Sequence, residues 1–285
     1  MEFIAEFNNF CEYSTISMKA IIKSFRESFA ESLSRNEYVI KYKEKYPAFF
    51  TFLKKRLSFS QPYGFYFSAG VIASSWLFII FLGLIQDVVS KEAFVQADLR
   101  IMNLVTGLRV LWVAKFFLWV TYLGDMPVVL GITLMAGLVL VSLNERRMAR
   151  FLVLGVSGGA VIATVFKLLL RRARPDIGFS MIHESSYSFP SGHAVISMVL
   201  FGMLGYFVFR KCRKWWQKIL VTVLAMLIIV MVGFSRIYLG VHWASDVVAG
   251  WVIGLSWLIL LLAFFEQAPL VGSNSKGSNP QFQGL

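Results

Sequence analysis

Charged residues are scarce in this chain of 285 residues, where Asp, Glu, Lys and Arg together make up 15%. Soluble globular domains typically carry about 25%. Hydrophobic residues reach 57%, and the mean hydropathy is +0.66. This composition argues against a soluble domain and excludes an intrinsically disordered chain. Only two cysteines are present, which excludes a disulfide framework.

The N-terminal 62 residues lack the pattern of a cleaved signal peptide, in which a charged segment precedes a short apolar core and a small-residue site. They are basic, with a rough helical pattern over Ser14–Leu33. Ala48–Leu57 is predicted to form a short amphipathic helix, which either lies on the membrane surface or packs as a small helical cap. We expect residues 1–62 to be a cytoplasmic helical segment. Residues 266–285, rich in Gly, Ser, Asn and Pro, are expected to be a disordered tail.

Long uncharged runs predict the membrane spans. No charged residue occurs between Leu57 and Gln86, and a helix needs about 20 apolar residues to cross a bilayer core. Six segments meet this pattern, with some shorter than the norm: Phe65–Ile85, Met126–Leu143, Phe151–Leu170, Gly192–Phe209, Ile219–Ser235 and Trp243–Phe265. Val110–Leu123 is interrupted by Lys115, which favours an interfacial or re-entrant helix. The predicted fold is an all-α polytopic membrane protein, with a six-helix core over residues 63–265 and interfacial helices.

The distribution of Lys and Arg predicts the orientation. Six spans put both termini on one side, and 19 of the 28 Lys and Arg residues fall on that side. The positive-inside rule therefore places the termini in the cytoplasm. The net charge of +12 is then mostly a topology signal and not a nucleic-acid-binding face. Cys11 and Cys212 both fall on the cytoplasmic side, where a structural disulfide is not expected.

Three clusters of polar residues stand at the ends of predicted spans, all on the non-cytoplasmic side. Ionisable groups at membrane depth are expensive and are functional candidates by default. The clusters are Lys167 with Arg174-Pro175, then Ser191-Gly192-His193, and then Arg236 with His242 and Asp246.

The residue types in these clusters suit the transfer of a phosphoryl group. The start of a helix at Ser191 offers unpaired backbone N–H groups and a positive dipole end to an anion, and Gly192 lets the anion approach closely. His242 and Asp246 are four residues apart on one helix side. The carboxylate can hold one imidazole nitrogen and leave the other free as a nucleophile. Nearby cations would stabilise charge on the phosphoryl oxygens.

Each cluster taken alone has an ordinary structural alternative. Lys167 can extend to the lipid headgroups, and Ser191 with Gly192 can be a simple helix cap. His242 and Asp246 can form a structural hydrogen bond or half of a metal site. The cations Arg174 and Arg236 disfavour a metal there. The coincidence of three clusters on one membrane face favours the functional interpretation.

Three stretches resemble the three-part motif of the type 2 phosphatidic acid phosphatase superfamily: Lys167-x6-Arg174-Pro175, Pro190-Ser191-Gly192-His193 and Ser235-Arg236-x5-His242-x3-Asp246. The resemblance covers about residues 63–265. It implies that His242 attacks phosphorus to form a phosphohistidine, that Asp246 orients it, and that His193 protonates the leaving oxygen. It also implies that no metal or other cofactor is needed and that the phosphate is held by Lys167, Arg174, Ser191, Gly192 and Arg236.

The resemblance implies an integral membrane phosphatase acting on a lipid phosphate or pyrophosphate. Undecaprenyl pyrophosphate, phosphatidylglycerol phosphate, phosphatidate and lipid A phosphates all fit, and the motif does not choose among them or give an oligomeric state. We expect a bacterial inner membrane location, with the site facing the periplasm or cell exterior. The alternatives are a lipid phosphotransferase, a vanadate-dependent haloperoxidase, which shares the motif but is soluble, and a non-catalytic lipid-phosphate binder or transporter.

Other polar residues carry less specific patterns. His183 and Glu184 either contact a headgroup or belong to a solvated loop, which we favour. Asp125 either lines the entrance or caps the second span, and we favour the cap. Arg171 and Arg172 either attract anionic headgroups or simply lie at the interface. Three tryptophans fit an interfacial belt: Trp112, Trp119 and Trp243.

Overall fold

The computed structural model describes residues 41, 44–47, 62–90, 93–175 and 177–267. The helices predicted at Ser14–Leu33 and Ala48–Leu57, and nearly all of the predicted tail, lie outside these residues. The chain divides into two units, Met1–Gly64 and Phe65–Leu285. Apart from the first three residues of one helix, all helices described below belong to the second unit.

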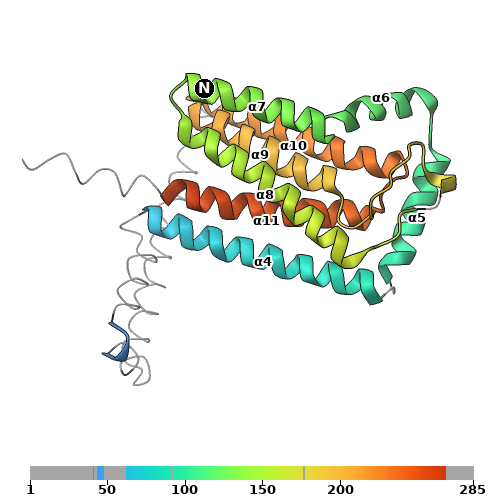
Figure 1. The fold of residues 1–285 in the computed structure, drawn as a ribbon, viewed down its shortest axis with the longest axis horizontal. Coiled ribbons are helices and arrows are strands. Elements are labelled where there is room, and N and C mark those ends of the chain that lie inside the picture. The colour runs from blue at the N-terminus through green and yellow to red at the C-terminus, as the bar shows by residue number, and fades with distance from the viewer. Residues whose placement is uncertain (1–40, 42–43, 48–61, 91–92, 176, 268–285) are drawn as a thin grey trace, which may run out of the picture. The chain divides into compact units, whose positions relative to one another are not determined.

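The described part of the chain contains eight α-helices, one short 3-10 helix and no strand, so the predicted all-α class is confirmed. The α-helices are α4 (Pro62–Ser90), α5 (Ala93–Gly107), α6 (Leu111–Tyr122), α7 (Met126–Ser142), α8 (Arg146–Leu170), α9 (Gly192–Lys211), α10 (Trp215–Tyr238) and α11 (Ala244–Gln267) (Figure 1).

Five helices in the described part are long and apolar enough to cross a membrane: α4, α8, α9, α10 and α11. The remaining predicted span corresponds to α7, which has 17 residues and a length of about 26 Å, slightly less than a bilayer core of about 30 Å. It follows α6 at a bend of 49°, and the two together form a broken span or a re-entrant loop. The protein is therefore a multi-pass membrane protein with five or six candidate spans.

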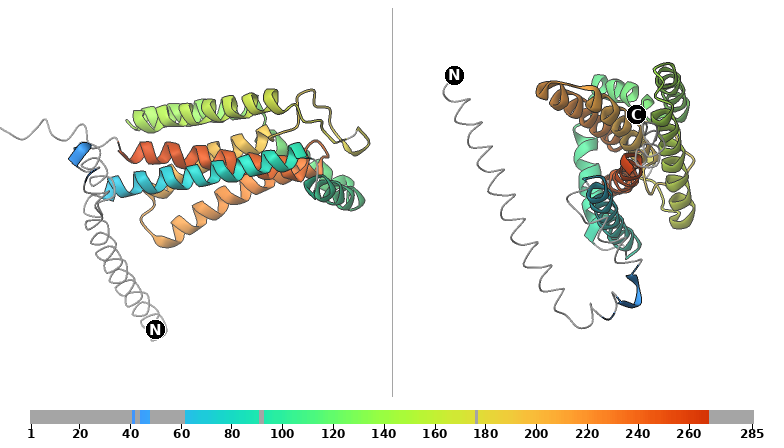
Figure 2. Two further views of the ribbon diagram at one scale, coloured as in Figure 1. Left: turned by 90° about the horizontal axis from the view of Figure 1, so that it is seen from below. Right: turned by 90° about the vertical axis from the view of Figure 1, so that its left-hand side faces the viewer.

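Helix α9 lies at the centre of the bundle and contacts α7, α8, α10 and α11 (Figures 1 and 2). Its residues 194–200 are all buried, as expected for a helix surrounded by others. The small residues Gly250 and Ala194 let α11 approach α9 closely. A Cβ added to Gly250 would lie only 2.8 Å from the Ala194 Cβ, so no larger residue fits there. This close packing fixes the start of α9 against the start of α11.

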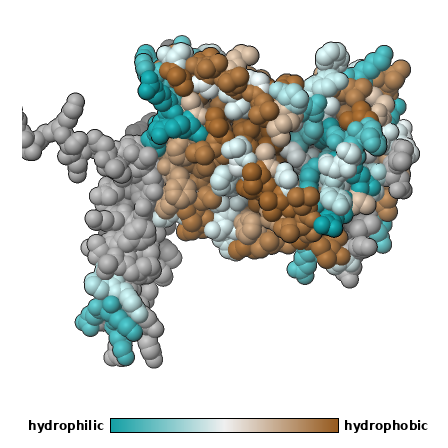
Figure 3. Space-filling view, in the orientation of Figure 1, coloured by the Kyte–Doolittle hydropathy of each residue, from teal (hydrophilic) through white to brown (hydrophobic). Residues whose placement is uncertain are grey.

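The outer surface of the bundle is apolar. Large hydrophobic side chains such as Trp76, Leu134 and Leu138 are exposed, and Figure 3 shows hydrophobic surface over the middle of the bundle with hydrophilic patches toward its ends. A soluble monomer rarely exposes so large an apolar area. The surface is therefore suited to contact with lipid chains.

Helices α5 and α6 gather at one end of the bundle with the segment 171–191 (Figure 1). A glycine ties this segment to the turn before α11. Gly240 has a φ of +76°, and a Cβ there would lie 1.9 Å from the Phe179 carbonyl oxygen. The Met181 N–H also donates to the Leu239 carbonyl at 2.9 Å. Only glycine accommodates both the positive φ and the close contact with Phe179. Together these contacts hold the turn that contains His242 in a fixed place.

Candidate active site

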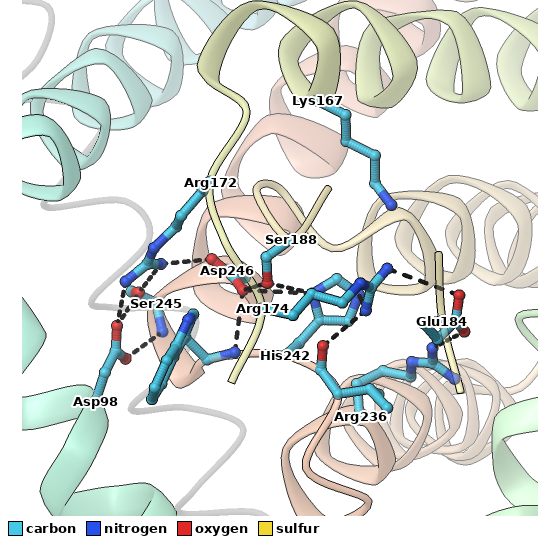
Figure 4. Close-up of polar contacts among 12 residues, drawn as sticks. Asp98, Lys167, Arg172, Arg174, Glu184, Ser188, Arg236, His242, Ser245 and Asp246 are labelled. Atoms are coloured by element: carbon cyan, nitrogen blue, oxygen red, sulfur yellow. Dashed lines mark hydrogen bonds and ion pairs between the residues drawn. The ribbon is translucent and has the colours of Figure 1, made fainter. Parts of the chain in front are cut away.

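His242 and Asp246 form a buried pair at this end of the bundle, with exposed side-chain fractions of 1% and 0%. His242 lies in the turn before α11, and Asp246 lies in the first turn of that helix. The His242 Nδ1 is 3.3 Å from the Asp246 Oδ2 (Figure 4). The same oxygen accepts a hydrogen bond from the Trp243 N–H at 3.0 Å. Because a carboxylate accepts hydrogen bonds, Nδ1 carries the proton and Nε2 keeps its lone pair.

Ser188 adds a third group to this pair. Its Oγ donates a hydrogen bond to the Asp246 Oδ2 and lies 3.3 Å from the His242 Nδ1. Ser188 is fully buried and comes from the loop before α9. The carboxylate therefore has a fixed orientation on its histidine side.

Arg172 and Asp98 form ion pairs beside the Asp246 Oδ1, the oxygen that does not contact His242. The Arg172 Nη1 is 2.5 Å from the Asp246 Oδ1, and its Nη2 is 2.7 Å from the Asp98 Oδ2. Asp98 belongs to α5 and also accepts hydrogen bonds from the Ser245 N–H at 2.9 Å and the Ser245 Oγ at 2.5 Å. Arg172 thus lies within the site. The sequence suggested either headgroup attraction or a place at the membrane interface for it, and neither describes this role.

Arg174 contacts the second nitrogen of His242, and Lys167 shares a hydrogen-bond partner with Arg174. The Arg174 Nη1 is 3.3 Å from the His242 Nε2 and donates to the Val241 carbonyl at 2.7 Å. The Ser186 Oγ accepts from Arg174 at 3.0 Å and from the Lys167 Nζ at 3.1 Å. Burial lowers the pKa of His242 well below its ordinary value, and the charges of Arg174 and the cations around it lower it further. His242 is therefore neutral at physiological pH.

Glu184 bridges two arginines of the site, so the favoured interpretation of it as part of a solvated loop is wrong. Its carboxylate pairs with Arg236 and lies 3.7 Å from the Arg174 Nη2. Arg236 is buried and also donates to the Thr121 Oγ1 at 2.7 Å. Burial raises the pKa of Glu184, but the charges of Arg236 and Arg174 outweigh this effect, and the net shift is downward. An ionised carboxylate thus lies between the two guanidinium groups.

Asp125 pairs with His193 and does not cap its helix through its side chain. It occupies the position before α7, but its side chain makes no capping hydrogen bond. Its Oδ1 is instead 2.7 Å from the His193 Nε2. The neighbouring Gly124 permits this approach, since a Cβ there would lie 2.7 Å from the His193 Cδ2.

The start of α9 contributes Ser191 and Gly192. The Ser191 N–H donates to the Asp246 carbonyl at 3.0 Å, whereas its buried Oγ has no hydrogen-bond partner within the described residues. A Cβ on Gly192 would lie 4.0 Å from the Lys167 Nζ. The backbone at the start of α9 therefore faces the Lys167 ammonium group. Because residue 192 is a glycine, no side chain fills the space between the two.

All eight residues of the predicted site lie at the same end of the bundle, at the ends of α8 and α10 and the starts of α9 and α11. His183, in contrast, is exposed in the loop. Trp112 and Trp119 are 72% and 75% exposed, as membrane-interface residues would be. The arrangement offers a buried, oriented imidazole beside several cations, which suits nucleophilic attack on a bound anion.

Comparison with known proteins agrees with this geometry. Residues 148–269 match the PAP2 superfamily. The chain carries a PAP2 superfamily domain. It is 29% identical over 192 residues to phosphatidylglycerophosphatase B from Bacillus subtilis, covering 67% of this chain and 94% of that protein. It is also 31% identical over 137 residues to undecaprenyl-diphosphatase from Sulfolobus acidocaldarius, covering 45% of this chain and 60% of the relative.

A solved structure shares the fold of the PAP2 domain. The crystal structure of a transmembrane PAP2-type phosphatidylglycerolphosphate phosphatase from Bacillus subtilis superposes with a TM-score of 0.63 at 28% identity. The match covers 68% of this chain and 96% of that one. The chain is therefore related to PAP2-type lipid phosphatases in both sequence and structure.

Several residues around the candidate site are not predicted by the three-part motif. Ser186 and Ser188 contact motif residues from outside the motif. Asp98 contacts Arg172, which in turn pairs with the motif residue Asp246, and no fixed spacing connects Asp98 to position 246. Thr121, on α6, supports Arg236 in the same way. The sequence offers one indication of a role for Asp98. It is the only acidic residue of α5, and this helix follows directly after a predicted membrane span.

Proposed function

We propose that this protein is a membrane lipid phosphatase that hydrolyses a lipid phosphomonoester or diphosphate through a phosphohistidine on His242. The observation that carries this proposal is the buried His242–Asp246 pair, in which Asp246 contacts Nδ1 and the Nε2 lone pair faces Arg174 at 3.3 Å. The relatives support a lipid substrate, since they are named for phosphatidylglycerophosphate and undecaprenyl diphosphate.

In the first step, the His242 Nε2 attacks phosphorus while the bond from phosphorus to the leaving oxygen breaks. His193, in its cationic form, gives the Nδ1 proton to that oxygen, while its Nε2–H stays bonded to Asp125 and fixes the orientation of the ring. Lys167, Arg174, Arg236 and the N–H groups at the start of α9 stabilise the charge on the phosphoryl oxygens. In the second step, water attacks phosphorus and gives a proton to His193 while the bond from phosphorus to the His242 Nε2 breaks, which releases inorganic phosphate.

The substrate phosphate would take the place of the Glu184 carboxylate. Both are anions, and the space between Arg174 and Arg236 is occupied by Glu184 in this structure. The substrate can displace Glu184 because this residue is part of a loop and is partly exposed, whereas Arg236 is anchored by Thr121. The loop would then move outward when substrate binds.

We propose a metal-independent reaction, because the positive charges of Lys167, Arg174 and Arg236 supply the stabilisation that a metal would otherwise give. The purified protein in detergent micelles is expected to release inorganic phosphate from phosphatidate, phosphatidylglycerol phosphate or undecaprenyl diphosphate, with the rate unchanged within about twofold in EDTA. Vanadate is expected to inhibit, since it mimics five-coordinate phosphorus.

Three outcomes would contradict this proposal. A strict requirement for Mg²⁺ or Zn²⁺ would exclude the metal-independent mechanism. Transfer of phosphate to a second lipid without release of free phosphate would favour the phosphotransferase. Lipid binding without turnover would favour a non-catalytic binder or transporter.

A cavity beside Arg174 supports a substrate with a long hydrocarbon chain. It has a volume of about 680 Å³, and its apolar lining comes from Val88, Val89, Leu99 and Leu170, with Arg171, Arg172, Ala173, Arg174, Asp98 and Trp243 completing it. Cations at one part of a cavity and aliphatic side chains at another match the two halves of a lipid phosphate. The first carbons of the lipid chain would lie against α4 and α5.

Replacing Val89 with tryptophan should obstruct this cavity. We expect kcat/KM for a long-chain lipid phosphate to fall about tenfold, which corresponds to about 1.4 kcal/mol, because the lipid chain loses its contacts. Hydrolysis of para-nitrophenyl phosphate, which has no such chain, should change less than about twofold. Both rates are measured by phosphate release.

Leu82→Trp is a matched control, since Leu82 is exposed two helical turns earlier on α4 and does not line the cavity. It should leave both rates unchanged. An equal fall for the two substrates in Val89→Trp, or no fall for either, would contradict the assignment of the cavity.

We also propose a bacterial inner membrane location, cytoplasmic termini and a site facing the periplasm or cell exterior. The support is the uneven distribution of Lys and Arg, with Arg210, Lys211, Arg213, Lys214 and Lys218 in one short segment at the end of the bundle opposite the site. Moving such a basic loop across the bilayer is disfavoured. The enzyme would then act on outer-leaflet lipids.

A further inference from the structure

Asp98 occupies a buried position for which the PAP2 motif gives no reason. It is 3% exposed and sits on α5, outside the helices that carry the motif. Its carboxylate accepts from the backbone and hydroxyl of Ser245 and pairs with Arg172 at 2.7 Å. A buried carboxylate is costly unless it is paired, so its contacts indicate a role connected with Arg172.

One guanidinium is shared by two carboxylates. Arg172 reaches Asp246 through Nη1 at 2.5 Å and Asp98 through Nη2 at 2.7 Å, as Figure 4 shows. The exposed side-chain fractions are 13% for Arg172 and 0% for Asp246, so solvent screens these charges weakly. The formal charge of the three groups together is −1.

We propose that Asp98 is a positioning residue that offsets the charge of Arg172, so that Asp246 presents a net negative charge to His242. This inference rests on the proposed phosphohistidine mechanism. When Nε2 takes up the phosphoryl group and Nδ1 keeps its proton, the imidazole ring becomes cationic. That cation forms beside Arg174, and the negative charge behind Nδ1 stabilises it.

Without Asp98, the charge of Arg172 would be balanced by Asp246 alone. The pair would then be formally neutral, and Asp246 would stabilise the cationic ring less. Asp98 would also no longer hold Arg172 from the side of α5. The effect would fall on the chemical step and not on phosphate binding, since Asp98 contacts none of Lys167, Arg174 or Arg236 within the described structure.

The test compares Asp98→Asn, Arg172→Gln and the double variant in steady-state phosphate release. We expect Asp98→Asn to lower kcat about 10–100-fold with KM changed less than about threefold, the size of coupling usual for residues in contact. Arg172→Gln should also lose activity, because it leaves two buried carboxylates without a cation. The double variant restores the formal charge of −1, and its kcat should exceed that of both single variants.

Any other ranking of the three variants would overturn the proposal, because it would show that the balance of charge around Asp246 does not set kcat. The split between kcat and KM separates this effect from a general structural defect. If one single variant does not fold in a thermal unfolding assay, the double variant is ranked against the other. Asp87→Asn is the control, since Asp87 makes no ion pair within the described chain, and it should keep wild-type kcat. Absence of phosphate release by the wild-type protein would instead refute the proposed function.

Discussion

Replacement of His242 with alanine is expected to lower kcat for lipid phosphate hydrolysis by about 10⁴–10⁶-fold, the loss commonly seen when a nucleophile is removed from a coupled site. The physical reason is that no other imidazole in the described part of the chain contacts both Asp246 and Arg174. His193 pairs with Asp125 and His183 is exposed. Phosphate release from purified protein measures the effect, with residual activity compared to the uncatalysed rate.

His183→Ala is the matched control, because it removes the same side chain from the loop of the same end of the protein. It should keep kcat within about twofold, since exposed substitutions away from the reacting groups have small effects. Wild-type phosphate release by His242→Ala would show that a different residue attacks phosphorus.

Asp246→Asn is expected to lower kcat by about 10³–10⁴-fold, similar to the loss of the orienting carboxylate in a serine protease triad. The amide removes the charge that stabilises the imidazole when it becomes cationic. Its NH₂ group can also donate to Nδ1, which would move the ring proton to Nε2 and remove the nucleophilic lone pair. Arg172 and Ser188 would lose an anionic partner at the same time.

The same kinetic assay separates this effect from simple unfolding. KM should change much less than kcat, and the thermal midpoint of the purified variant should show that the bundle is intact. Asp87→Asn, the same substitution on the exterior of α4, should be close to wild type. A loss of less than about tenfold for Asp246→Asn would exclude an orienting role for its carboxylate.

Membrane spans were predictable because their signal is local. A run without charge must be long enough to cross the hydrocarbon core, and only a helix satisfies its backbone there. The ends were less predictable: α4 runs from Pro62 to Ser90, beyond the predicted Phe65–Ile85. Polar residues such as Asp87 can continue a helix at the membrane surface, so hydropathy alone does not mark where the helix stops.

Most of the differences between the site expected from the sequence and the site in the structure come from contacts between separate elements. The i, i+4 spacing of His242 and Asp246 predicts their contact within one turn of helix, and the structure shows it. The contact of Glu184 with Arg236 joins a loop to α10 across 52 residues of sequence. No local pattern encodes that distance, so a solvated loop was the simpler and incorrect expectation for Glu184.

Asp125 illustrates the same principle. Its position before Pro127 is typical of a helix cap, and it does precede α7. Its side chain turns to His193 because α9 packs beside this turn, where Gly124 leaves room for the imidazole ring. Packing between helices, which spacing in sequence does not specify, decides which partner such a carboxylate takes.

Trapping the covalent intermediate tests the central claim most directly. Wild-type protein turning over a lipid substrate with a radiolabelled phosphate is quenched in base, where phosphohistidine survives, and its peptides are examined by mass spectrometry. We predict a phosphoryl group on His242, more of it in His193→Ala because water attack then lacks its base, and none in His242→Ala. Steady release of phosphate with no phosphorylated His242 at any time would contradict the account.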